Sequence, residues 1–188
     1  MNKPTQEQAE EAIKTLLQYL GEDTNREGLK DTPKRVIKSY KEIFGGYEAD
    51  VSAILNKKFY EISQYQDIIL LKNINFTSTC EHHMLPFTGK VDIAYVPDKV
   101  VIGISKLARL VDAFSKRLQI QERMTVSIAE SLFKHLQPKG VAIAVSASHS
   151  CMSFRGVMKE GSLLDSSHFI GCFKDDIQMQ KQFFNMIK

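Results

Sequence analysis

One short stretch of the chain, TSTCEHHMLPF at residues 77–87, gathers side chains that bind metal ions. Cys80 and His83 lie within it, although the whole chain has three cysteines and five histidines. A thiolate and an imidazole are donors that zinc prefers, and a corner between a strand and a turn would let both reach one ion. Two ligands alone do not hold a metal, so a small buried thiol is the competing interpretation of Cys80.

A second stretch, SHSCMSFRG, supplies further donors. His149 and Cys151 are two positions apart in a run that we expect to be a strand, so their side chains should share one face. Cys80, His83 and Cys151 would then be three protein ligands with an open fourth position, which is the arrangement of catalytic zinc. His149 is either a fourth ligand or a free proton carrier beside the metal, because imidazole titrates near neutral pH. His82 has the same two interpretations.

Hydroxyl and basic side chains suggest an anion site near these donors. Ser105, Lys106 and Arg109 fall in the first turns of an expected helix, where free backbone N–H groups and the helix dipole favour negative charge. Arg155 follows four residues after Cys151. Together these residues suit a chain of phosphates, and an ordinary solvated positive face is the alternative.

The stretch QIQER at residues 119–123 places an amide beside a carboxylate. Gln121 and Glu122 have the acceptor and donor groups that recognise the N–H edge of a guanine-like ring. Helix capping or a plain surface position is the alternative for this pair.

The elements that position these residues follow from the periodicity of the chain. Thr5 and Gln8 form a capping-box pattern before an apolar helix face that ends at Gly21. A second helix is expected with Thr32 as its N-cap and Pro33 in its first turn. Further helices are predicted at residues 105–117 (with Ser105 as N-cap), 121–136 and 175–187.

Runs of β-branched and aromatic residues predict four strands. They cover residues 67–80, 87–97, 140–154 and 166–173. The order is helices, two strands, two helices, two strands and a final helix. This order indicates an α+β fold with antiparallel hairpins.

The composition narrows the class of protein. With 188 residues, of which 43% are apolar and 25% charged, the chain can bury a core without disulfides. A net charge of +3 is far from the basic excess of nucleic-acid-binding proteins, so no nucleic-acid partner is expected. The longest apolar run, VAIAV, is too short to cross a bilayer, and the first residues lack a signal-peptide pattern. We therefore expect a cytoplasmic protein without a membrane partner, in which Cys172 is a buried thiol.

Four segments resemble the signature segments of the GTP cyclohydrolase I family in order and separation. They are CEHHMLPFTG, IGISKLAR, RLQIQERMT and HSCMSFRGV. The stretch GEDTNREGLKDTPKRVIKSYKEIFGGY is similar to the N-terminal helical region of the same family. The resemblance covers nearly the whole chain.

The resemblance implies a fold and an assembly. The fold would be the tunnelling fold (T-fold), a four-stranded antiparallel sheet with two helices between strands 2 and 3, preceded by N-terminal helices. Residues 1–60 would be the N-terminal helical region and residues 61–188 the T-fold catalytic domain, in one continuous functional unit. Subunits would form a homodecamer of two stacked pentamers, with active sites between subunits.

The resemblance also implies a role for each residue singled out above. The metal Zn²⁺ would be bound by Cys80, His83 and Cys151, and the acid–base pair would be His82 and His149. The guanine of GTP would be anchored by Glu122 with Gln121, and its triphosphate held by Ser105, Lys106, Arg109, Arg155 and Lys38. The implied reaction converts GTP and water to 7,8-dihydroneopterin triphosphate and formate, the first step of folate or other pterin biosynthesis.

The chain departs from the family pattern at a few positions. Leu164 stands where a threonine is common, and Ser146 and Ser148 stand where acidic residues are common. These positions concern packing and subunit contacts, because none of them is a proposed ligand or catalytic group. No specific role is expected for Glu81 beyond support of the metal ligands.

Two other functions compete with this interpretation. A 7-deazaguanine-type reductase of the same fold uses a cysteine nucleophile and a nicotinamide cofactor, and it needs none of the three zinc positions. A non-catalytic protein that keeps zinc for stability would not need His82, His149 or Glu122.

Overall fold

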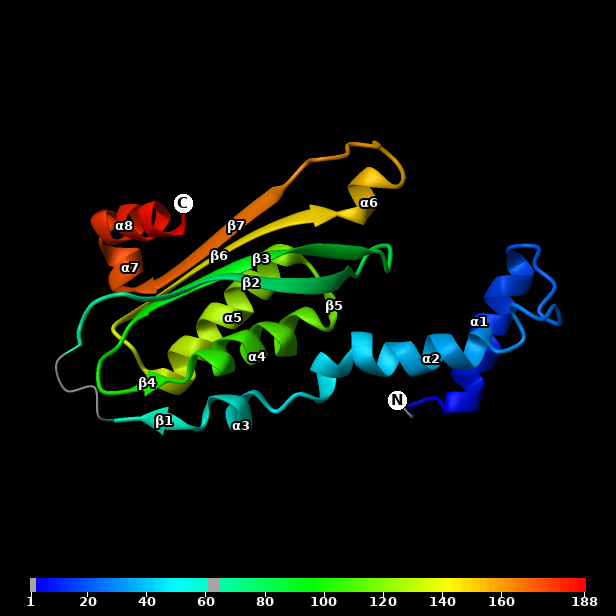
Figure 1. The fold of residues 1–188 in the computed structure, drawn as a ribbon, viewed down its shortest axis with the longest axis horizontal. Coiled ribbons are helices and arrows are strands. Elements are labelled where there is room, and N and C mark those ends of the chain that lie inside the picture. The colour runs from blue at the N-terminus through cyan, green and yellow to red at the C-terminus, as the bar shows by residue number, and fades with distance from the viewer. Residues whose placement is uncertain (1–2, 61–64) are drawn as a thin grey trace. The chain divides into compact units, whose positions relative to one another are not determined.

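A computed structural model describes residues 3–60 and 65–188 (Figure 1). The chain forms two compact units, Met1–Gly45 and Gly46–Lys188. The expected boundary between residues 60 and 61 adjoins residues 61–64, which lie outside the described part of the chain. The division into a helical region and a catalytic domain at that point therefore stays a prediction.

The first unit consists of two helices that contact each other, α1 (Gln6–Tyr19) and α2 (Thr32–Ile43). The capping box of α1 is confirmed, because Thr5 and Gln8 each donate a backbone N–H to the side chain of the other. The N-cap expected for α2 is wrong by one residue. Asp31 is the cap, and Thr32 is already helical, with its hydroxyl donating to the carbonyl of Gly28 over 3.3 Å.

The second unit is built on a five-stranded sheet in the order β5-β2-β3-β6-β7. Its long antiparallel strands are β2 (Ile69–Cys80), β3 (Pro86–Val96), β6 (Gly140–His149) and β7 (Leu164–Gly171). The two-residue β5 (Leu118–Gln119) runs parallel to the end of β2, and β1 (Lys58–Phe59) pairs with β4 (Val101–Ile102) in a separate small sheet. The four long strands confirm the predicted ones, whereas two-residue strands are too short to give a periodic signal.

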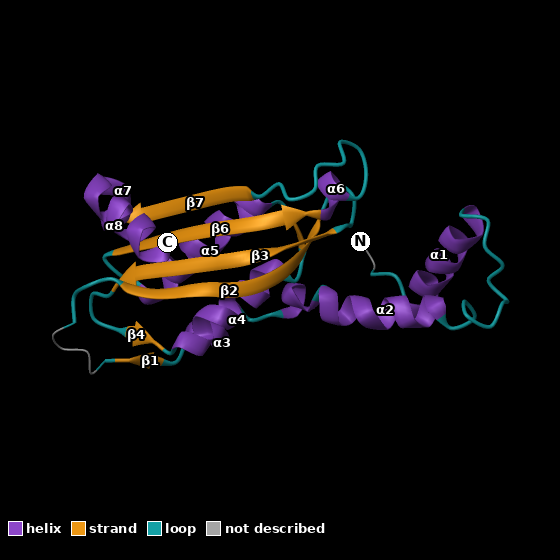
Figure 2. Cartoon of the chain, turned by 45° about the horizontal axis from the view of Figure 1, so that its top comes forward, coloured by secondary structure: helices purple, strands orange, loops and turns teal. Residues whose placement is uncertain are grey.

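Two long helices lie between β3 and β6 in the chain and cover one face of the sheet (Figure 2). They are α4 (Ile104–Ser115) and α5 (Gln121–Leu136). The remaining helices are η1 (Gly45–Glu48), α3 (Val51–Leu55), α6 (Ser150–Ser153), α7 (Cys172–Asp175) and α8 (Ile177–Ile187). The antiparallel sheet with two helices inserted after its second long strand confirms the T-fold.

Alternation along the strands creates two cores, because successive side chains point to opposite faces of the sheet. Ile93 and Ile143 belong to the larger core beneath α4 and α5. Their neighbours Ala94 and Ala142 face the other side, where Phe183 of α8 is buried. No helix among residues 3–60 and 65–188 is both long and apolar enough to cross a membrane.

Three expected element ends are wrong, and each has a local reason. Helix α4 is capped by Gly103 in an extended conformation, so Ser105 is the second helical residue rather than the cap. Strand β6 ends at His149, and Cys151 lies in the single turn of α6. Strand β7 ends at Gly171, whose φ of +61° and close approach to the carbonyl of Lys139 suit glycine, so Cys172 begins a helix.

Candidate active site

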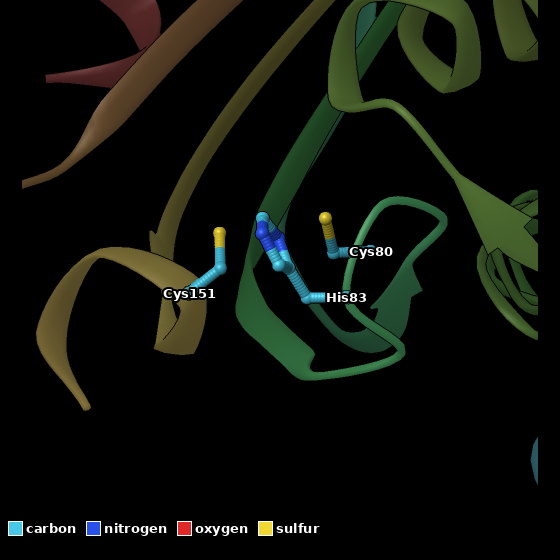
Figure 3. A group of neighbouring side chains, drawn as sticks. All are labelled: Cys80, His83 and Cys151. Carbon is cyan, nitrogen blue, oxygen red and sulfur yellow. The ribbon is translucent and has the colours of Figure 1, made fainter. Parts of the chain in front are cut away.

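Three side chains that could hold a metal ion, here called the metal-binding group, meet at one end of the sheet (Figure 3). Cys80 ends β2, His83 lies in the turn between β2 and β3, and Cys151 lies on α6 directly after β6. Their ligand atoms all lie within 4.8 Å of one another. The register explains this meeting, because Phe87 at the start of β3 pairs with His149 at the end of β6.

This group of donors fits a tetrahedral zinc ion. Zinc bonds of about 2.3 Å to sulfur and about 2.0–2.1 Å to nitrogen imply donor separations of roughly 3.5–3.8 Å. The observed limit of 4.8 Å allows that geometry with small side-chain movements. Two thiols and an imidazole favour zinc over magnesium or calcium, which prefer oxygen ligands. Cys80 is buried and His83 exposed, so the group has one side that faces solvent.

The thiol of Cys151 is held in its protonated form by its surroundings. Burial and the neighbouring Cys80 raise the pKa of Cys151, and the positive charge of Arg155 partly opposes that rise. A cysteine binds zinc as the thiolate, so metal binding at this group must displace a proton.

The two histidines of the CEHH segment occupy different positions. His83 belongs to the metal-binding group, whereas His82 is exposed, with its Nδ1 3.8 Å from the sulfur of Cys80. His83 also accepts a hydrogen bond at Nε2 from the guanidinium of Arg155 over 2.8 Å. Arg155 therefore places a positive charge directly beside the metal-binding group.

His149 is fixed in place by two contacts. Its ring stacks on that of Phe87, with centroids 4.5 Å apart and an interplanar angle of 5°. Its Nε2 lies 2.9 Å from Oε1 of Gln121. The amide nitrogen of Gln121 donates to the carbonyl of Leu164 and approaches the hydroxyl of Ser166. The Oε1 atom can only accept, so Nε2 of His149 carries the hydrogen and Nδ1 is the nitrogen left to take up a proton.

The surroundings also favour the neutral form of the His149 ring. Burial lowers its pKa, because a desolvated imidazolium is unfavourable, and the negative charge of Glu122 partly opposes that effect. A neutral imidazole with one open nitrogen is suited to act as a base.

Gln121 and Glu122 begin α5 but differ in exposure. Gln121 is 1% exposed, and its amide is taken up by contacts inside the chain, so its side chain positions His149. Glu122 is exposed in the first turn of the helix, where its carboxylate is open to a ligand. The sequence did not indicate the supporting roles of Ser166 and Phe87, because both are ordinary strand residues whose partners come from distant segments.

The residues of α4 that were expected to bind anions follow the end of the sheet opposite to Cys80. The N–H of Ile102, just before α4, donates to the hydroxyl of Tyr95, and Tyr95 pairs with Ile69 at the start of β2. Cys80 ends the same strand. Within one chain, the first turn of α4 with Ser105 and Lys106 therefore begins away from the metal-binding group, and Arg109 lies about one turn further along the helix.

Lys38 lies on α2 of the first unit and is exposed. The metal-binding group lies in the second unit, so the expected contact of Lys38 with phosphate stays a prediction. Arg155 is the one expected phosphate ligand that the described residues place at the metal-binding group.

The T-fold sheet and the Cys-His-Cys group define a T-fold protein with a metal-type site. A family model described as GTP cyclohydrolase I matches residues 9–188. The chain is 59% identical over 186 residues to GTP cyclohydrolase 1 of Rickettsia felis, covering 99% of this chain and 98% of the relative. It is 57% identical over 187 residues to GTP cyclohydrolase 1 of Rickettsia typhi, covering 100% and 98%. The chain belongs to the GTP cyclohydrolase I family.

Solved structures give a more distant likeness. An archaeosine synthase QueF-Like in the apo form is 19% identical with a TM-score of 0.47, covering 55% of this chain and 93% of that chain.

Proposed function

We propose that this protein is a zinc-dependent GTP cyclohydrolase I that converts GTP and water to 7,8-dihydroneopterin triphosphate and formate. The observation that carries the proposal is the meeting of Cys80, His83 and Cys151 beside a positioned, neutral His149. Family membership over residues 9–188 supports the same reaction. The product would enter folate or another pterin pathway in the cytoplasm.

Cys80, His83 and Cys151 would hold the zinc ion. When bound, zinc supplies a Lewis acid that lowers the pKa of a water molecule to about 7. The chain contributes three ligands and an exposed side, which is the arrangement that leaves a position for water or substrate. The positive charge of Arg155 beside this position favours an anionic ligand.

Two histidines would move the protons that opening the guanine ring and releasing formate require. His149 accepts or donates at Nδ1, because Gln121 holds the hydrogen on Nε2. His82 is exposed beside the metal-binding group and can exchange protons with solvent. A general acid or base of this kind contributes about 10²–10⁴-fold to a rate.

Glu122 would anchor the guanine by accepting hydrogen bonds from its N–H edge. Gln121 assists indirectly in this proposal, because its amide is buried and holds His149. The carboxylate and the base would thus be fixed at neighbouring positions of one helix turn. Such positioning accelerates a reaction by removing freedom that the reactants would otherwise have to lose.

Ser105, Lys106 and Arg109, together with Arg155 and Lys38, would hold the triphosphate. In the same chain the first turn of α4 follows Ile102, which contacts Tyr95 opposite the start of β2, whereas Cys80 is at the end of β2. A complete site therefore requires that a second copy supply its α4 to the metal end of the first. We propose the homodecamer of two stacked pentamers, with active sites between subunits, as the assembly that meets this requirement.

The decisive experiment is incubation of the purified protein with GTP in the presence of zinc. We expect release of formate and, after oxidation, a fluorescent pterin, and both should disappear with a zinc chelator. A zinc-loaded protein that yields neither product would favour the non-catalytic alternative. Consumption of a nicotinamide cofactor by metal-free protein would favour the reductase.

A further inference from the structure

Glu81 is the member of the CEHH segment to which the reaction assigns no role. It lies between Cys80, a proposed metal ligand, and His82, a proposed acid–base group. Its carboxylate forms a salt bridge with Arg123. Arg123 in turn directly follows Glu122, the proposed guanine anchor. One ion pair therefore joins the segment that binds metal to the helix turn that would bind the base of the substrate.

The ion pair is the outer part of a network of hydrogen bonds around β5. The N–H of Glu81 donates to the carbonyl of Gln119 over 3.1 Å. Arg123 donates to the side-chain oxygen of Gln119 over 3.3 Å, and Gln119 donates its own amide to the carbonyl of Phe114 over 2.8 Å. Cys80 pairs with Gln119 in the parallel ladder. Gln119 is thus held by the metal-binding turn, by α4 and by α5 together.

The exposure of the pair argues against a large role in folding stability. The side chains of Arg123 and Glu81 are 52% and 30% exposed. They line an open cavity of about 450 Å³ that also includes Arg117 and Tyr47. Ion pairs that water reaches contribute little to stability. A misplacement of about 1 Å between a metal and a substrate anchor, by contrast, can lower a rate about 100-fold.

We propose that Glu81 and Arg123 form a positioning pair that holds the metal-binding turn in a fixed relation to the start of α5. The proposal rests on the proposed function, since it concerns the relation of the zinc ligands to the guanine anchor. Neither side chain touches the reacting atoms. The pair acts through Cys80 and His82 on one side and through Glu122 on the other.

The test uses Glu81→Gln, Arg123→Gln, the double variant Glu81→Gln/Arg123→Gln and the reversed pair Glu81→Arg/Arg123→Glu in the full-length protein. Arg117→Gln is the matched control, because Arg117 lines the same cavity but lies over the rings of Tyr47 and Phe114. Zinc affinity is measured by competition with a chelator, kcat and KM at saturating zinc, and Tm by thermal unfolding. A double-mutant cycle then separates the pairwise effect from the single effects.

We expect each single substitution to lower zinc affinity or kcat about 10–100-fold, as loss of a group that orients a ligand does. The KM for GTP and the Tm should change little, and the reversed pair should recover most of the loss. Single variants that match Arg117→Gln would overturn the proposal. So would a double Gln variant as defective as the sum of its two single changes, a reversed pair that recovers nothing, or losses that follow the Tm.

The zinc titration keeps this proposal separate from the proposed reaction. If the unaltered protein releases no formate, the reaction is wrong, and the chelator competition still decides whether the pair orients the zinc ligands. If the unaltered protein is active and all the variants retain its zinc affinity and kcat, the reaction stands and the positioning pair is wrong.

Discussion

The two ends of the sheet differ in how much of a site one chain provides. At the metal end, β2, the following turn and α6 bring three donors together, and α5 fixes a histidine beside them. At the α4 end, Ser105, Lys106 and Arg109 would form the proposed anion site, without such donors among the described residues. In the proposed function, one subunit would therefore supply the metal ligands and the base, and binding of the triphosphate would require a second copy.

The largest effect is expected from Cys151→Ser, which removes one of the three proposed metal ligands and leaves α4 unchanged. Removal of one thiolate should reduce the zinc content from about one per chain to a small fraction, because two ligands hold the ion poorly. Formate release should fall to background. Metal analysis and a formate assay check both results. The matched control is Cys172→Ser, which lies outside the metal-binding group and should keep its zinc. A metal-free preparation with full activity would refute the zinc mechanism.

His149→Ala should lower kcat by about 10²–10⁴-fold while zinc remains bound. The expected cause is loss of the base at Nδ1, so the Tm and the KM should change much less than kcat. Steady-state kinetics and thermal unfolding measure the two effects, with His168→Ala on β7 as the control. Unchanged turnover would remove His149 from the catalytic role.

Glu122→Ala should weaken the binding of GTP by about 10–100-fold, since the site would lose a charged acceptor for the guanine N–H groups. Binding of GTP and ITP is compared by calorimetry, because the hypoxanthine base of ITP lacks the exocyclic amino group. The variant should lose most of the preference for GTP. Glu130→Ala, an exposed carboxylate farther along α5, is the control. An unaltered preference in Glu122→Ala would contradict the anchor.

Arg109→Ala should break the α4 end alone, raising the KM for GTP about tenfold without loss of zinc. Mixing this variant with Cys151→Ser tests whether the two ends of the sheet contribute to one site from different subunits. If each site draws on two subunits, co-assembled mixtures should contain sites with the unaltered KM for GTP, which neither variant provides by itself. Lys134→Ala controls for general loss of positive charge. Mixed oligomers that recover nothing would argue against sites between subunits.

The smallest effect is expected from Tyr95→Phe, which removes the acceptor for the N–H of Ile102 at the start of the α4 end. The cost should be about 1 kcal/mol in the free energy of unfolding, with kcat unchanged. Burial raises the pKa of Tyr95, so its proton is held more tightly in the folded state. The contribution of Tyr95 to the free energy of unfolding is therefore present below about pH 10 and declines as the pH rises further. Denaturant unfolding of both proteins across this range measures the difference, which should shrink in alkali.

The sequence predicted features that depend on local pattern and residue type. The four long strands were predictable because apolar and β-branched residues cluster in them. Cys80, His83 and Cys151 were predictable as a set because few other side chains in the chain have the same chemistry. In both cases the signal is in the residues themselves.

Features that depend on distant partners were not predictable from the sequence. Gln121 was expected to face the substrate, yet Val145 and Leu164 offer its amide buried carbonyls. The single turn of α6 replaced the expected end of a strand, so the argument that His149 and Cys151 share one strand face was wrong. The strand β5 forms because Leu118 and Gln119 pair with the end of β2. A two-residue strand is too short to show a periodic pattern of apolar residues in the sequence.

The fixed ring of His149 has a consequence for the order of events in a catalytic cycle. Stacking on Phe87 and the bond to Gln121 prevent the imidazole from turning over, and they keep Nε2 away from solvent. In the proposed mechanism every proton would therefore enter and leave through the same nitrogen. A proton given to the substrate would be replaced from the substrate side, through His82 or through water admitted after the product departs. Reprotonation of Nδ1 would thus be a step of each turnover.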